Sequence, residues 1–270
     1  MRWDRNYSSS EIEDRRGDSP ASGGGDGLPL FGLLRLASIF GWPGLAIGLV
    51  IAAVVGLGQH FSGGSHVSSE HRPAASSPKE DELVHFVGFV FDDVQKSWRA
   101  QLPEYRDAHL VLFRNRWQSA CGTATPAVGP FYCPLDHKVY LDLAFYDELR
   151  TRFGAPGDFA QAYVIAHEVG HHVQNQRGLL GRGSPDSVHI ELQADCLAGA
   201  WARDADRRGL LEAGDVEQAL NAASQIGDDA IQRRTQGYVR PETFTHGSSA
   251  QRTEAFRTGL QGGAAACGIR

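Results

Sequence analysis

A helix-forming segment at residues 158–178 carries two histidines four positions apart, in the order His167-Glu168-Val169-Gly170-His171. Breakers at 154–157 precede it, Asp158 is a good N-cap, and Gly178 suits a C-terminal stop. Residues four apart share one helix face, so both imidazoles can reach one metal ion only if this segment is helical. A core-facing side is supplied by Phe159, Ala162, Ala166, Val169 and Val173.

The pattern His-Glu-x-x-His is typical of zinc peptidases. This pattern predicts that His167 and His171 are metal ligands and that Glu168 is the general base that acts on a metal-bound water. The chain has 11 histidines in 270 residues, and about 0.02 matches would arise by chance in a chain of this composition. The pattern alone therefore leaves open a pair of exposed histidines on a solvated helix.

The sequence downstream offers a third ligand. Catalytic zinc usually takes three protein ligands and keeps a fourth position for water. Ser187 can cap a second helix, on which Glu191 and Asp195 lie four apart and share a face. We expect Glu191 to be the third ligand and Asp195 to accept the far N–H of a zinc-bound imidazole. Glu191 alone would be interpreted as a surface carboxylate, but its position soon after the histidine pair favours a ligand.

Motifs over nearly the whole chain carry a family resemblance. They lie at residues 1–4, 12–17, 129–134, 139–142, 167–174, 191–195 and 245–252. In these motifs the chain resembles the bacterial putative neutral zinc metallopeptidase family, membrane-anchored proteins of the zincin type. The resemblance implies one Zn²⁺ per chain, carried by His167, His171 and Glu191, with Glu168 as catalytic base. Only the residues after Cys267 differ from the usual ending of the family.

Four further histidines have expected roles outside the ligand set. A second donor is expected for the substrate oxyanion, and His246 is the candidate. The spacing Thr-His-Gly-Ser-x-x-x-Arg at 245–252 resembles a segment that follows the third ligand in related integral-membrane zinc peptidases. Alternatively, His246 precedes a helix that starts near Ser248 and faces water. His172 lies about 100° from His171 on the helix, so it is expected to be solvated or to support the site, as are His137 and His189.

The remaining segments indicate an α+β domain of the zincin-like type, with an active-site helix and a small sheet. Residues 110–113 and 138–142 have strand character, and 129–133 can pair with the latter across a turn at 134–137. Zincins place an edge strand beside the active-site helix, where a peptide adds as a further strand. Residues 139–142 are either that edge or an interior strand. A further helix is expected from Asp215 to about 235.

Composition divides the chain into four parts. Residues 1–35 are polar and predict a disordered tail. Residues 36–58 carry no charge, and 23 residues of helix span about 34 Å, enough to cross a bilayer as a single transmembrane helix. A cleaved signal peptide or a buried core helix fits this run less well. Residues 59–83 are a predicted linker, and 84–270 form one metallopeptidase domain.

The charged residues and the cysteines indicate on which side of a membrane the metallopeptidase domain lies. Arg35 precedes the uncharged run closely and Arg72 follows at a distance, which favours the N-terminus inside and the domain outside, periplasmic or extracellular. Two disulfide bonds would suit an oxidising compartment. Four reduced cysteines are the alternative. The expected pairs are Cys121 with Cys133, which flank a hairpin, and Cys196 with Cys267, which would tie the second metal helix to the C-terminus.

The expected function is that of a membrane-anchored zinc metallopeptidase that hydrolyses a peptide or protein substrate. A net charge of −6 and an isoelectric point near 6.0 provide no basic surface for nucleic acid. Two alternatives stay open, a non-catalytic zinc-binding membrane factor of the same fold and a zinc amidase that acts on cell-wall peptides. The zinc ligands alone do not distinguish them.

Overall fold

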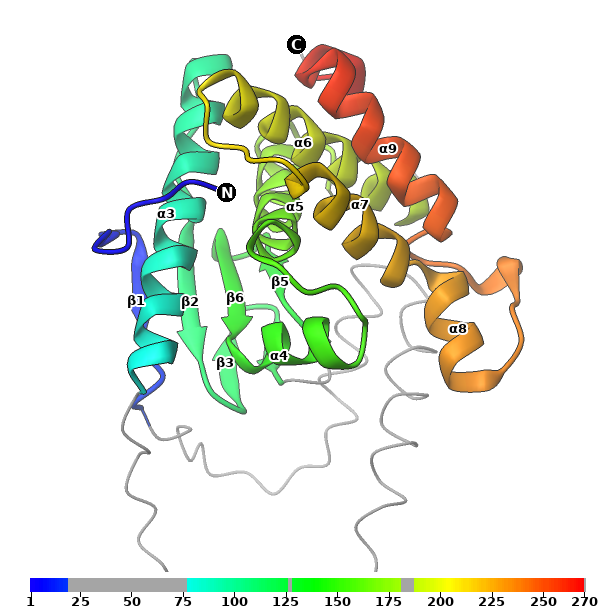
Figure 1. Cartoon of the computed structure of the whole chain (residues 1–270), viewed down its shortest axis with the longest axis horizontal. Helices are drawn as coiled ribbons and strands as arrows, with labels where there is room; N and C mark the ends of the chain where they lie inside the picture. The colour runs from blue at the N-terminus through cyan, green and yellow to red at the C-terminus, as the bar shows by residue number, and fades with distance from the viewer. Residues whose placement is uncertain (19–76, 126–127, 181–186, 270) are drawn as a thin grey trace, which may run out of the picture.

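A small mixed sheet flanked by long helices organises the chain (Figure 1). The structure is a computed structural model that describes residues 1–18, 77–125, 128–180 and 187–269. Its helix-and-sheet content confirms the expected α+β class. The segment 36–58, expected to cross a membrane, lies outside these ranges. Within them, no helix combines the length and apolar character needed to traverse a bilayer.

The sheet has the strand order β1-β2-β6-β5. β1 (Ile12–Asp14), β2 (His109–Phe113) and β6 (Lys138–Asp142) run parallel, and β5 (Phe131–Cys133) pairs antiparallel with β6. The expected strands and the β5–β6 hairpin are confirmed. β6 is interior, however, so the edge strand near the metal helix is β5.

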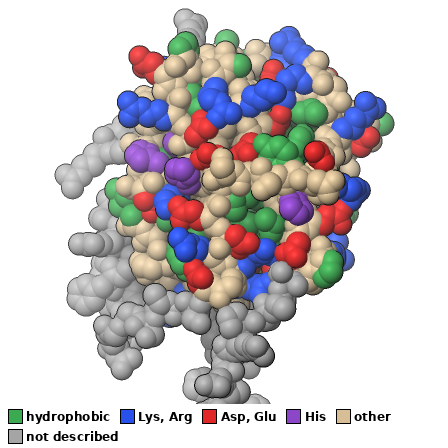
Figure 2. Space-filling view, turned by 90° about the vertical axis from the view of Figure 1, so that its left-hand side faces the viewer, with side chains coloured by type: hydrophobic (Ala, Val, Ile, Leu, Met, Phe, Trp, Pro, Cys, Tyr) green, Lys and Arg blue, Asp and Glu red, His purple; other side chains and the backbone are tan. Residues whose placement is uncertain are grey.

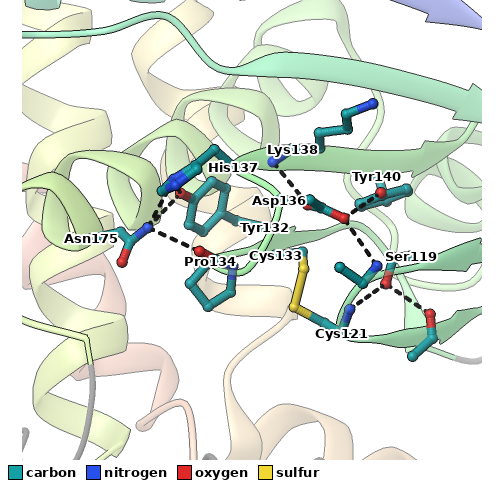
Figure 3. Close-up of a disulfide and its surroundings, with 12 residues drawn as sticks. Ser119, Cys121, Tyr132, Cys133, Pro134, Asp136, His137, Lys138, Tyr140 and Asn175 are labelled. Atoms are coloured by element: carbon teal, nitrogen blue, oxygen red, sulfur yellow. Dashed lines mark hydrogen bonds between the residues drawn. A yellow bond between two sulfur atoms is a disulfide. The ribbon is translucent and has the colours of Figure 1, made fainter.

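The two faces of the sheet pack against different groups of residues, because side chains point to alternate faces along each strand. Leu110 and Leu112 of β2 join the main core together with the helices. Val111 and Phe113 face the other way, into a smaller cluster with the hairpin of β3 (Trp117–Ser119) and β4 (Gly122–Ala124). The predicted disulfide bond between Cys121 and Cys133 is present and fastens this hairpin to β5 (Figure 3).

Helix α3 (Pro78–Gln101) covers the main-core face and contacts the metal helix α5 (Asp158–Gln176). Ser77 caps α3 by accepting a hydrogen bond from the backbone N–H of Glu80, 3.2 Å away. The predicted linker 59–83 is therefore too long. Its last residues, 78–83, are the first turns of α3, because the Ser-Pro-x-Glu start is itself a helix-initiating signal.

Residues 1–18 were expected to belong to a disordered tail, and that expectation is wrong. They run beside α3 and add β1 to the sheet through parallel pairing with β2 (Figure 1). The segment is polar and has no apolar period, which is why composition predicts disorder. Contacts with distant residues order the segment despite its polar composition. One of them is the edge-to-face packing of Trp3 on Phe86.

The carboxyl-terminal half is helical. After α4 (Ala144–Thr151) and α5 come α6 (Ser187–Arg207), α7 (Asp215–Gln225), α8 (Asp228–Gln236) and α9 (Ser249–Gly262), with short 3-10 turns at Pro241–Thr243 and Ala264–Cys267.

Two local predictions about these helices need correction. Gly157, with a φ of 114°, is the N-cap of α5, and Asp158 is its first residue. The helix expected from Asp215 to about 235 is broken at Gly227. A Cβ at Gly227 would lie 2.4 Å from the backbone nitrogen of Ser249, so the start of α9 packs directly against this break.

Helices α6 and α9 cross with their backbones in close contact. A Cβ at Gly199 would lie 2.0 Å from the carbonyl oxygen of Phe256, and one at Gly259 would lie 1.8 Å from that of Cys196. The second predicted disulfide bond, Cys196 to Cys267, is also present and joins α6 to the turn after α9. This close crossing carries Arg252 of α9 toward the metal helix.

Candidate metal centre

Three side chains from α5 and α6 point their donor atoms at one place. The donor atoms of His167, His171 and Glu191 all lie within 4.8 Å of one another. One carboxylate oxygen of Glu191 is 3.2 Å from His167 Nε2, and the other is 3.5 Å from His171 Nε2. A tetrahedral zinc ion with bonds of about 2.0–2.1 Å would hold its donors about 3.3 Å apart. Both contacts of Glu191 are close to that spacing.

The far nitrogen of each histidine is held by a hydrogen-bond acceptor. His167 Nδ1 lies 2.9 Å from Asp195 Oδ1, and His171 Nδ1 lies 2.8 Å from Gln174 Oε1. When Nδ1–H donates to these oxygens, the lone pair of each Nε2 faces Glu191. Two lone pairs and a carboxylate then converge, which is the arrangement that a divalent cation requires. The structure thus brings Asp195 to the position expected from the sequence.

Gln174 was not identified from the sequence as part of this centre. It is fully buried, and its Nε2 donates to the carbonyl oxygen of Ile190 at 2.7 Å and to Gln193 Oε1 at 3.0 Å. These two acceptors fix the orientation of the amide, so its Oε1 must face His171. The signal was its position three residues after His171 on the same helix.

Asp195 belongs to a buried network that sequence reasoning also missed. Arg252, 3% exposed, donates from Nε to Asp195 Oδ2 at 2.8 Å and from Nη2 to Asp195 Oδ1 at 3.0 Å. The Tyr163 hydroxyl donates to the same carboxylate at 2.5 Å. Burial opposes ionisation of Asp195, but Arg252 and His167 outweigh it and hold its pKa at about 2. Tyr163 lies one helical turn before His167, whereas Arg252 is far away in sequence.

The electrostatic environment favours a cation at this point. Burial lowers the pKa of His167, but Asp195 and Glu191 together raise it to about 10. Burial likewise raises the pKa of Glu191, and the two histidines pull it well below its usual range. The carboxylates therefore stabilise positive charge between the imidazoles, and Zn²⁺ would supply that charge.

Gly170, between the two histidines, permits close approach of α5 and α6. A Cβ at this position would lie 3.1 Å from the carbonyl oxygen of Ala194 and 3.2 Å from its Cα. Ala194 is itself fully buried. A small residue at 170 thus lets α6 bring Glu191 and Asp195 within reach of the histidine pair, at a propensity cost of about 1 kcal/mol relative to alanine.

Glu168 is buried beside His167, with 7% of its surface exposed. Tyr146 of α4 is also buried, and its hydroxyl has no hydrogen-bond partner among the described residues. Burial, and then the charge of Glu168, raise the pKa of Tyr146 well above its usual value. Tyr146 is therefore a neutral donor in the surroundings of Glu168.

His246 lies just before α9, which starts after its N-cap Ser248 as expected. Its Nδ1 is 3.2 Å from Asp228 Oδ1, and 43% of its side chain is exposed. Partial burial lowers the pKa of His246, but Asp228 and Glu191 raise it above its usual value. Asp228 also accepts the backbone N–H groups of Thr245, His246 and Gly247 at 2.6, 2.7 and 3.1 Å. The loop thus holds His246 near the metal ligands.

Three further histidines considered from the sequence, His137, His172 and His189, lie outside this centre. His172 is 2% exposed, so a solvated role is wrong for it. Its Nε2 donates to the carbonyl oxygen of Arg106 at 2.7 Å, and its Nδ1 lies 2.9 Å from the hydroxyl of Tyr132 on β5. Burial lowers its pKa to about 4. His137 is exposed and lies 3.1 Å from the same hydroxyl (Figure 3). His189 is exposed on α6.

Comparison with known proteins agrees with this geometry. The uncharacterized protein YpfJ of Escherichia coli is 41% identical over 284 aligned residues, which cover 97% of this chain and 96% of that protein. The uncharacterized protein Rv2575 of Mycobacterium tuberculosis is 44% identical over 190 residues, which cover 64% of this chain and 65% of that protein. No solved structure matches the chain. A family model described as putative neutral zinc metallopeptidase matches residues 1–268. The chain therefore belongs to the putative neutral zinc metallopeptidase family.

Proposed function

We propose that this protein is a zinc-dependent peptidase with one Zn²⁺ held by His167, His171 and Glu191. The observation that carries the proposal is the convergence of these three donors within 4.8 Å of one another, with the far side of each imidazole held by Asp195 or Gln174. A bound zinc ion would polarise the scissile carbonyl and lower the pKa of a coordinated water to about 7. The helix pair supplies the rigid frame that such chemistry needs.

Glu168 is the proposed general base. It follows His167 directly on α5 and is buried, so it is the neighbour of a metal ligand and is shielded from bulk water. In this role Glu168 takes a proton from the attacking water and later delivers it to the leaving amine. Cleavage of an unfolded protein that requires zinc and is lost in Glu168→Gln is the test of the assignment.

The fold supports a peptide substrate. β5 is an edge of the sheet formed by the described residues, and it contacts α5. The hydroxyl of Tyr132 on β5 lies 2.9 Å from Nδ1 of His172 on α5. Asn175, also on α5, donates from Nδ2 to the same hydroxyl at 2.9 Å (Figure 3). An extended peptide added to this edge would gain main-chain hydrogen bonds independent of its side chains. This arrangement is zincin-like, with the edge strand fixed beside the metal helix.

His246 is the proposed donor to the developing oxyanion, oriented by Asp228. His246→Ala is expected to lower kcat about 10²–10³-fold, the usual loss when one oxyanion donor is removed, while zinc stays near one per chain. Steady-state hydrolysis and elemental analysis of the same preparation measure both quantities. His109→Ala is the control, because His109 lies on β2 and more than half of its side chain is exposed. Loss of zinc from His246→Ala would make His246 a ligand or a structural residue instead.

The protein is further proposed to act at a membrane, with its metal domain on the extracytoplasmic side. The two disulfide bonds support an oxidising compartment for that domain. Nucleic acid is not proposed as a partner, because the chain carries a net charge of −6.

A further inference from the structure

The N-terminal segment, residues 1–18, is built into the fold of the metal domain. Strand β1 pairs in parallel with β2, in a register that places Ile12 beside Leu110 and Asp14 beside Leu112. Main-chain hydrogen bonds extend the pairing at both ends. The N–H of Leu110 donates to the carbonyl of Glu11 at 2.9 Å, and the N–H of Arg15 donates to that of Leu112 at 2.8 Å. The segment therefore completes the sheet on the side opposite to β5.

Side chains of the N-terminal segment also fit the surface of α3. The hydroxyls of Tyr7 and Ser9 each donate to the carboxylate of Asp92 at 2.8 Å. A Cβ at Gly88 would lie only 3.1 Å from the Cβ of Ser9 and 3.2 Å from Ile12. Helix α3 thus has no side chain at the point where the N-terminal segment crosses it, which is the sign of a dedicated contact.

Arg16 joins the two ends of the intervening chain. It is 9% exposed and binds Asp14 through Nε at 2.9 Å and Nη2 at 2.7 Å. The same guanidinium lies 3.3 Å from Glu80 and 3.3 Å from Asp81, in the first turn of α3. Arg16, which lies just before residues 19–76, therefore binds two residues that lie just after them, Glu80 and Asp81.

We infer that the N-terminal segment and the metal domain lie on the same side of any membrane to which the protein is attached. β1 cannot pair with β2 across a bilayer, so the two strands must lie on one side of it. The arrangement expected from the sequence, with the N-terminus inside and the metal domain outside, is therefore incompatible with the docked strand.

The first test compares the two parts of the full-length chain in spheroplasts. Ser8→Cys marks the N-terminal segment and Thr258→Cys marks α9, both at exposed positions. The native cysteines are in disulfide bonds and do not react. A membrane-impermeant maleimide should label the two variants alike, either both before permeabilisation or both only after it. If one variant is labelled in intact spheroplasts and the other only after permeabilisation, the inference is overturned.

The second test asks whether the N-terminal segment is docked in cells. Disulfide bonds need Cβ atoms about 3.5–4.5 Å apart, so Ser9→Cys with Gly88→Cys should link after a shift of a few tenths of an ångström. Cells are treated briefly with a membrane-permeable oxidant, thiols are blocked before lysis, and bonds are mapped by mass spectrometry. We expect a 9–88 bond, and none in the control pair Ser9→Cys with Thr258→Cys. Equal yields in the two pairs would contradict specific docking.

Discussion

Glu168→Gln is expected to lower the rate of peptide hydrolysis about 10²–10⁴-fold, the usual contribution of a general base, with zinc content unchanged at one per chain. The amide nearly matches the shape of the carboxylate but cannot accept a proton from water. The metal ligands are His167, His171 and Glu191, so the substitution leaves the donor set intact. The rate is measured as the appearance of new amino termini in an unfolded protein substrate.

Glu217→Gln is the matched control, because Glu217 is exposed on α7. It makes the same chemical change away from the metal centre and should leave hydrolysis unchanged. If Glu168→Gln hydrolyses peptides as fast as the wild type, Glu168 is not the base. If neither protein cleaves any peptide and both behave alike in cells, a non-catalytic zinc-binding factor becomes the better account. Cleavage confined to cell-wall peptides would instead favour the amidase.

Arg252→Met is expected to lower the free energy of unfolding by about 3–5 kcal/mol, the usual effect of removing one partner of a buried ion pair. Arg252 donates two hydrogen bonds to Asp195, which has no exposed surface. Methionine roughly conserves the apolar stem but leaves that carboxylate with one cationic partner fewer. Such a loss is a large fraction of the stability of a typical domain.

The control for this prediction is Arg257→Met, an exposed position on the same helix. Surface substitutions of this kind usually change stability by less than about 0.5 kcal/mol. Urea unfolding of both variants is measured at one fixed zinc concentration, since ligand binding itself stabilises the folded state. Equal midpoints for the two variants would show that the buried contact between Arg252 and Asp195 is not needed for stability.

The parts of the centre that sequence could predict are those encoded locally. His167 and His171 are one helical turn apart, and so are Glu191 and Asp195, so helical periodicity alone places each pair on a face. The bond between Cys121 and Cys133 could be proposed because these cysteines are only 12 residues apart. These features depend on a few neighbouring residues, and local structure follows from them.

The parts that were missed depend on contacts between distant segments. Arg252 reaches Asp195 only because Gly199 and Gly259 let α6 and α9 approach closely, and no local pattern encodes that crossing. The docking of the N-terminal segment also depends on contacts with distant parts of the chain. Its polar composition resembles that of a disordered tail, while its order comes from β2, α3 and the ion pairs of Arg16.

The proposed chemistry depends on the binding of one zinc ion by His167, His171 and Glu191. Elemental analysis of the purified full-length chain, exposed to zinc and then dialysed, tests it most directly when wild type is compared with Glu191→Ala and with the exposed Glu217→Ala. We predict about one zinc per chain in wild type and Glu217→Ala, and almost none in Glu191→Ala, because two imidazoles alone leave the tetrahedral set incomplete. Wild-type protein without zinc, or Glu191→Ala with a full complement, would contradict the account.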